Sequence, residues 1–168
     1  TTYDGASPRT PEEVLSNAAN FASTGGWTVV AGNPMDHYSA HPFMILTPEQ
    51  QALVEKVAAG IYRPCCGNSV IFPDCNHGMA MFGLLELLAS QGVGEKEMYK
   101  IALQANSYWF PDTYLTLAKF WQNKGVDWNK VDPREVLGAN YSSGPGYQKI
   151  LSQVEEVKSA PSAGGCEV

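Results

Sequence analysis

Charged side chains are scarce in this chain of 168 residues, where Asp, Glu, Lys and Arg together make up only 17%. The net charge is −6, and no stripe of Lys and Arg runs along the sequence. Proteins that bind nucleic acid need clustered cations to neutralise phosphates, so nucleic acid is not an expected partner. The longest apolar block, residues 78–89, is interrupted by Glu86 and is shorter than the roughly twenty residues that span a bilayer, which predicts no membrane span.

Signatures of several enzyme classes are also missing. The chain has no nucleophile elbow, phosphate-binding glycine loop, C-x-x-C-H haem motif or H-E-x-x-H zinc motif. Its carboxylates are scattered, and none form a pair placed for glycoside hydrolysis. An independent hydrolase therefore has little support, and the sequence leaves open whether the protein is an enzyme.

Cysteine and histidine are rare, with four and three copies, yet three of the cysteines and one histidine lie within residues 65–77. Cys65, Cys66, Cys75 and His77 form the pattern C-C-x8-C-x-H. Four such donors can complete one tetrahedral set around a metal ion or occupy the four corners of a cubane cluster. The pattern predicts one metal or redox site, supported by the rest of the chain.

Capping patterns predict a mostly α protein. Thr10, Thr47 and Asp132 are each followed by proline and then, at the third helical position, by an acid or amide, which marks a helix start. Apolar spacing and chain breaks predict helices at 11–22, 48–62, 74–90, 95–107, 111–123 and 148–158, a short helix after Pro133, a short strand at 27–30 and a loop at 142–146. We expect a compact bundle of about five to six helices with long irregular loops, forming a single domain over residues 1–158, before a small polar tail at 159–168.

The expected helix start at Asp74 sets the geometry of the site. With Asp74 as N-cap, Cys75 and His77 occupy the first turn at N1 and N3. Helix N-termini carry free N–H groups and positive potential, which lower the pKa of a cysteine and stabilise an anionic cluster. Pro64 ends the preceding helix and delivers Cys65 and Cys66 to the same place.

An iron–sulfur cluster is the favoured occupant. Adjacent cysteines bind one ion only through a cramped chelate ring, whereas each thiolate of a cubane binds a different iron. The segment Cys65-Cys66-Gly67 resembles the cluster-bearing subunit of the proton-pumping NADH:quinone oxidoreductases, and the resemblance implies a [4Fe–4S] cluster held by a Cys-Cys pair. With Cys65, Cys66, Cys75 and His77 as ligands, we expect electron transfer or redox sensing, together with a redox partner protein or a larger assembly.

Copper and zinc are the alternative occupants. Thiolate, thioether and imidazole donors suit Cu(I), and His37, His41 and Met79 are further candidate ligands. Met79 and Met81 lie two residues apart in a predicted helix, so at least one of them fills the core instead. Zinc accepts three cysteines and one histidine, although two to four residues usually separate its paired cysteines.

Thiol–disulfide exchange between Cys75 and either Cys65 or Cys66 is a separate hypothesis. Residues 61–66 with the apolar helix that follows resemble the exported thiol reductases of cytochrome c maturation; those proteins use a C-x-x-C pair, whereas here Cys75 has to act as the resolving cysteine. A third hypothesis is a structural accessory subunit, whose cysteines only stabilise the loop. The aromatic residues 108–110 either pack in the core or shield the site.

The ends of the chain carry two weaker signals. The first residue is Thr1 rather than methionine, which predicts a processed protein exported to the periplasm or the extracellular space, where thiols can oxidise. Cys166, in the polar tail, is expected to be a free thiol or a covalent link to a partner.

Overall fold

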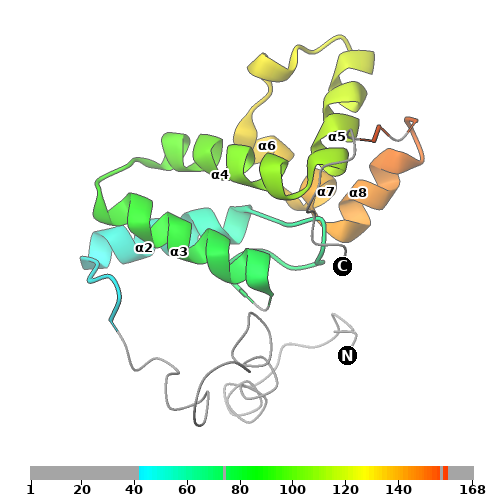
Figure 1. The fold of residues 1–168 in the computed structure, drawn as a ribbon. Coiled ribbons are helices and arrows are strands. Elements are labelled where there is room, and N and C mark those ends of the chain that lie inside the picture. Colours follow the sequence, from blue (N-terminus) through cyan, green and yellow to red (C-terminus); the bar gives the residue numbers. More distant parts are fainter. Residues whose placement is uncertain (1–41, 74, 156, 159–168) are drawn as a thin grey trace.

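The computed structural model describes residues 42–73, 75–155 and 157–158, and this part of the chain is mostly helical (Figure 1). Seven α-helices and one 3-10 helix follow one another within it, without a strand. The predicted mostly α bundle is therefore confirmed. No helix among the described residues is long and apolar enough to cross a membrane.

Helices α2 (Pro48–Gly60) and α3 (Asn76–Ser90) lie side by side and antiparallel (Figure 1). The predicted capping box starts α2: Thr47 accepts a hydrogen bond from the Gln50 amide, and the Gln50 side chain accepts one from the Thr47 amide. The Gln50 side chain also donates to the carbonyl of Ala89 at 2.9 Å, which ties the start of α2 to the end of α3. This pair of helices forms the base on which the site is built.

Helix α4 (Glu95–Trp109) packs across α2 and α3, and α5 (Pro111–Asn123) turns sharply away from its end (Figure 1). Gly92 adopts a φ of 76°, a left-handed conformation that glycine adopts without strain, in the tight connection from α3 to α4. At the other end of α4, Phe110 ends one helix and precedes Pro111, the first residue of the next. This corner lies beside the start of α3 and brings aromatic side chains to it.

The C-terminal part differs from the prediction. After the 3-10 helix η3 (Trp128–Lys130) come α6 (Pro133–Val136), α7 (Ala139–Ser142) and α8 (Gly144–Leu151). The predicted loop at 142–146 is wrong because Ser143 caps α8 by accepting a hydrogen bond from the Gly146 amide at 3.0 Å. The helix predicted at 148–158 accordingly begins four residues earlier and ends at Leu151.

Several predictions fall outside the described residues. They are the helix at 11–22, the strand at 27–30, the candidate ligands His37 and His41, and the tail with Cys166. The single domain over residues 1–158 also stays a prediction.

Candidate metal centre

The paired cysteines lie in a narrow loop that follows α2. The Val70 amide donates to the carbonyl of Ile61 at 2.8 Å, and Tyr62 and Ser69 form an isolated antiparallel bridge. Within the loop, the Cys66 amide donates to the carbonyl of Arg63 at 3.1 Å, which closes a turn over Pro64 and Cys65. These backbone contacts fix the stem of the loop, so that the cysteine pair is carried on a defined turn.

The C-terminal helices hold the same loop from the other side. The Gly144 amide, at the start of α8, donates to the carbonyl of Cys66 at 2.8 Å, and the Tyr62 amide donates to the carbonyl of Leu137 at 2.8 Å. A Cβ atom on Gly144 would lie 3.2 Å from the carbonyl oxygen of Pro64. The close approach of α8 to the cysteine pair therefore depends on a residue without a side chain.

Cys75 and His77 belong to the start of α3, as predicted, but the helix begins one residue later than predicted. The N-cap of α3 is Cys75, whose sulfur accepts a hydrogen bond from the Gly78 amide at 3.4 Å, and His77 takes the second helical position. The prediction of Asp74 as N-cap, with Cys75 at N1 and His77 at N3, is therefore wrong. A cysteine sulfur that caps the helix lies directly at its positive end.

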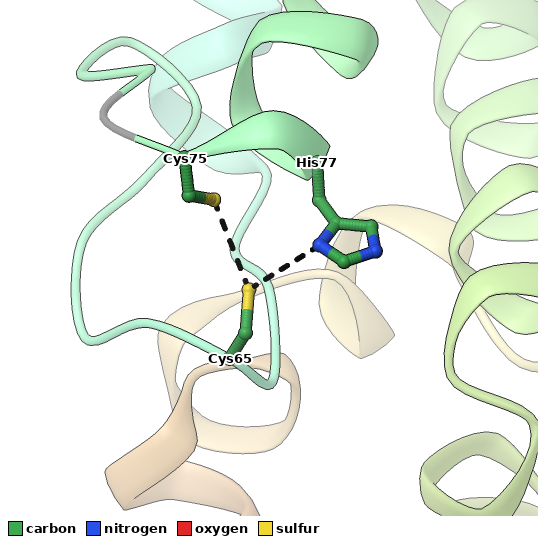
Figure 2. A group of neighbouring side chains, drawn as sticks. All are labelled: Cys65, Cys75 and His77. Carbon is green, nitrogen blue, oxygen red and sulfur yellow. Dashed lines mark hydrogen bonds between the residues drawn. The ribbon is translucent and has the colours of Figure 1, made fainter. Parts of the chain in front are cut away.

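Four donor atoms gather in the space between the loop and α3. Cys65 Sγ lies 3.9 Å from Cys75 Sγ and 3.9 Å from His77 Nδ1 (Figure 2). It also lies 3.4 Å from Cys66 Sγ. The ligand atoms of Cys65, Cys75 and His77 all lie within 4.8 Å of one another. These three residues can hold a metal ion.

Cys66 lies next to this group, in contact with the two other cysteines. Its sulfur lies 3.5 Å from Cys75 Sγ as well as 3.4 Å from Cys65 Sγ. Adjacent cysteines thus bring their sulfurs close together here without a bond between them, since Cys65, Cys66 and Cys75 are all free thiols. Adjacent cysteines can bind a single ion only through a cramped chelate ring. This arrangement of the loop is compatible with such a ring.

The three sulfurs share their protons unequally. The pKa of Cys75 is held well below its ordinary value, because Cys65 and Cys66 direct hydrogen bonds to its sulfur and the Gly78 amide and the charge of Arg63 add to them. The pKa of Cys65 is raised, mainly because its S–H hydrogen-bonds with Cys66 and Cys75. Of the three thiols, Cys75 is therefore the one that loses its proton most readily, whereas the contacts of Cys65 favour its protonated form.

A buried positive charge lies beneath the cysteines. Arg63 has an exposed fraction of 0%, and its Nη2 atom donates to Asn68 Oδ1 at 3.2 Å. A Cβ atom on Gly78 would come within 3.1 Å of the guanidinium carbon of Arg63, so the guanidinium lies under the first turn of α3. Its charge lowers the pKa of both Cys66 and Cys75, although other contacts raise the pKa of Cys66 overall.

Aromatic rings cover the histidine. The ring of His77 lies 4.5 Å from that of Phe110 and 5.6 Å from that of Trp109, between ring centroids. Both aromatic residues come from the α4–α5 corner and pack against the core as well as against His77, while Tyr108 next to them is 77% exposed. Nδ1 of His77 points towards the sulfur of Cys65, as Figure 2 shows.

Of the other predicted ligands, only Met79 lies within the described residues, and its side chain is 46% exposed. Met81 is fully buried in the core, as the helical spacing predicts for one of the two. Sequence reasoning missed Arg63 and Gly144. No local pattern marks either residue, because the role of Arg63 depends on α3, which follows it, and that of Gly144 depends on the cysteine loop, which comes far earlier in the chain.

No protein family model, curated protein or solved structure matches the chain. The two resemblances suggested by the cysteine pattern therefore gain no support from comparison. Function has to be argued from the geometry and chemistry of the site.

Proposed function

We propose that this protein binds one thiophilic metal ion through Cys65, Cys75 and His77, with Cys66 as the fourth ligand. The observation that carries the proposal is the spacing of 3.4 to 3.9 Å between the neighbouring donor atoms. In a tetrahedral site with metal–sulfur bonds of about 2.3 Å, neighbouring sulfurs lie about 3.8 Å apart. The donors therefore need little movement to enclose a single ion.

A [4Fe–4S] cluster fits this spacing less well. Each thiolate of a cubane binds a different iron, so its four ligand atoms lie considerably farther apart than around one ion. The loop at 65–70 would have to move away from α3 to admit the cluster. The cluster remains a prediction, and electron transfer or redox sensing applies to it or to a single redox-active ion, iron or copper.

The charge next to the site favours a divalent ion. Three thiolates and a neutral imidazole around a divalent ion leave one negative charge, and around Cu(I) they leave two. The buried guanidinium of Arg63 offsets the single negative charge of the divalent complex, whereas the Cu(I) complex would keep one negative charge uncompensated. Zinc, which commonly takes three cysteines and one histidine, is the ion that we expect.

Metal analysis of protein purified without oxygen tests the proposal. We expect about one divalent ion per chain, and Co(II) added to metal-free protein should show thiolate charge-transfer absorption. Cys75→Ser and His77→Ala should each weaken binding by at least about tenfold. Cys166→Ser is the matched control, because it removes the one cysteine outside residues 65–77, and its binding should equal that of the wild type.

The same measurement separates the alternatives. About four irons per chain with broad absorption would replace the single ion by the cubane. Unchanged metal content in both Cys75→Ser and His77→Ala would show that the ligand set is wrong. If the protein keeps its fold after it loses the metal, the metal serves a function other than stabilising the fold.

A thiol–disulfide oxidoreductase is the second candidate, and the lowered pKa of Cys75 favours it. The Cys75 thiolate would attack a substrate disulfide and form a mixed disulfide, and a thiol of Cys66, 3.5 Å away, would then displace the reduced substrate. Two electrons and two protons pass from the two thiols to the substrate. This candidate predicts protein without metal and a Cys66–Cys75 or Cys65–Cys75 disulfide after mild oxidation, which peptide mapping detects.

A further inference from the structure

A groove lies between the first half of α4 and the segment that runs from η3 into α6. Its volume of about 900 Å³ is within the range of small-molecule sites. Lys100, which lines it, precedes Trp109 by about 13 Å along the helix axis at 1.5 Å per residue. The groove is therefore separate from the cysteine cluster, which lies at the other end of α4.

Cationic side chains gather around this groove in an otherwise acidic protein. The chain has 11 Lys and Arg residues and a net charge of −6. Five of these cations line the groove: Lys56, Lys96, Lys100, Lys130 and Arg134. They come from α2, α4 and the η3–α6 segment, so the fold concentrates positive potential that the sequence distributes.

The two carboxylates in the groove are engaged with its own walls. Glu95 pairs with Lys56 at 2.5 Å and with Arg134 at 3.6 Å, and so it holds two cations in place. Asp132 caps α6 by accepting a hydrogen bond from the Arg134 amide at 2.9 Å. Lys100 in turn pairs with Glu97, beside the groove, at 2.8 Å. Three of the five cations are therefore held by ion pairs, and the lining of the groove keeps an excess of positive charge.

An apolar surface adjoins the cations. Trp128, Leu103 and Val131 are half-buried and line the groove. The guanidinium of Arg134 lies 5.8 Å from the centroid of the Tyr99 ring, which fixes it beside this surface. A flat apolar group and a negative charge can thus be bound next to each other.

We propose that this groove binds a small organic anion that combines a planar ring with phosphate-type charge, such as a nucleotide. The lysines and Arg134 take the charge, and Trp128 packs against the ring. A groove of about 900 Å³ suits a small molecule rather than a polymer.

ATP is the first probe, titrated into the protein as purified and followed by calorimetry and tryptophan fluorescence, with the metal content measured before and after. We expect saturable binding that weakens with salt. Lys96→Glu combined with Lys130→Glu should weaken it by at least about tenfold. Lys119→Glu combined with Lys149→Glu changes the net charge equally at exposed positions outside the groove, and this control should change binding by less than about threefold.

Two further titrations test the role of the ring. Inorganic triphosphate should bind more weakly than ATP, and Trp128→Phe should reduce ATP binding while leaving triphosphate binding unchanged. Absence of saturable binding up to about 1 mM ATP, or equal losses in the two double variants, would overturn the proposal. Equal affinity for triphosphate and ATP would overturn the assignment of Trp128 to a ring.

Discussion

At the scale of single residues, Cys75 combines three influences that rarely meet at one sulfur. It caps α3, it accepts hydrogen bonds from two other thiols, and it lies close to the buried charge of Arg63. Each influence favours the thiolate, and their sum outweighs the cost of partial burial. Cys65 is more exposed than Cys75, yet its pKa moves in the opposite direction.

Alkylation of metal-free protein tests this charge distribution. Between pH 8 and pH 6 the reaction rate of an ordinary thiol falls by roughly a hundredfold, because its pKa lies near 8.5. We expect the rate at Cys75 to change little over this range, and Cys65 to react more slowly than Cys75 despite its exposure. Peptide mapping after iodoacetamide treatment measures each rate, and equal pH dependence at Cys75 and Cys66 would contradict the assignment.

The sequence predicted the donor set but not how each donor is held. Cys65, Cys66, Cys75 and His77 stand close together in the chain, so a short loop can bring them together almost regardless of the fold. The sequence predicted Asp74 as the N-cap of α3, whereas the observed N-cap is Cys75, one position later. Capping preferences alone do not decide between two neighbouring residues. The burial of Arg63 depends on the packing of α3 over it.

At the scale of elements, α8 acts as a clamp on the cysteine loop. Its first residue, Gly144, donates its amide to Cys66 and approaches the carbonyl of Pro64 closely. Ser143 and Pro145 carry the same combination of cap and proline that marks α2 and α6. That signal was present in the sequence, but two glycines beside it favoured a loop.

Gly144→Ala tests the clamp. The added Cβ would lie 3.2 Å from the Pro64 carbonyl oxygen, so we expect the loop to shift, the free energy of unfolding to fall by about 1 to 2 kcal/mol, and metal affinity to fall with it. Gly83→Ala in α3 is the matched control. Apart from its chain neighbours and the backbone of its own helix, no described atom lies within 4 Å of the added Cβ, so helix propensity should raise stability by up to about 1 kcal/mol.

Urea unfolding and a competitive metal titration measure both effects of these substitutions. A Gly144→Ala protein with the stability and the metal affinity of the wild type would show that α8 does not restrain the cysteine loop. A loss of stability in Gly83→Ala would show that the comparison of the two glycines is not sound.

At the scale of the whole molecule, a buried hydrogen-bond network joins the helices behind the site. Asn106 in α4 donates to the carbonyl of Tyr62 at 3.1 Å and to the Tyr114 hydroxyl at 3.0 Å. Ser142 donates to the carbonyl of Val136 at 2.7 Å, so Tyr114 is the donor in its 2.8 Å contact with Ser142. The network connects α4, α5 and α7 to the strand-like segment that leads into the cysteine loop.

The Tyr114 hydroxyl predicts how stability depends on alkaline pH. Burial raises the pKa of Tyr114 to about 12, above the ordinary value near 10. Because the folded state keeps the proton to a higher pH than the unfolded state, Tyr114 contributes to the free energy of unfolding. This contribution is complete below pH 10 and is lost as the pH rises towards 12. The loss amounts to about 2 to 3 kcal/mol at about 1.4 kcal/mol per pH unit.

Tyr114→Phe checks this pH dependence. The variant should be less stable than the wild type by about 1 to 3 kcal/mol at pH 7, because Asn106 and Ser142 each lose a partner. The difference should shrink between pH 10 and pH 12, since only the wild type loses the Tyr114 contribution. Unfolding curves measured at pH 7, 9, 10 and 11 decide this, and parallel pH profiles would contradict the assigned pKa.

Local physical chemistry was enough to predict the helical class, the starts of α2, α4, α5 and α6, and a loop that brings three cysteines and one histidine together, because caps, apolar spacing and a short loop act over a few residues. Only the tertiary structure decided what surrounds them. Arg63 lies under the thiols, Trp109 and Phe110 cover His77, and α8 clamps the cysteine loop. The basic groove, too, draws its cations from segments separated by tens of residues. Such contacts depend on how helices pack across the whole chain, and the sequence pattern near each residue does not encode them.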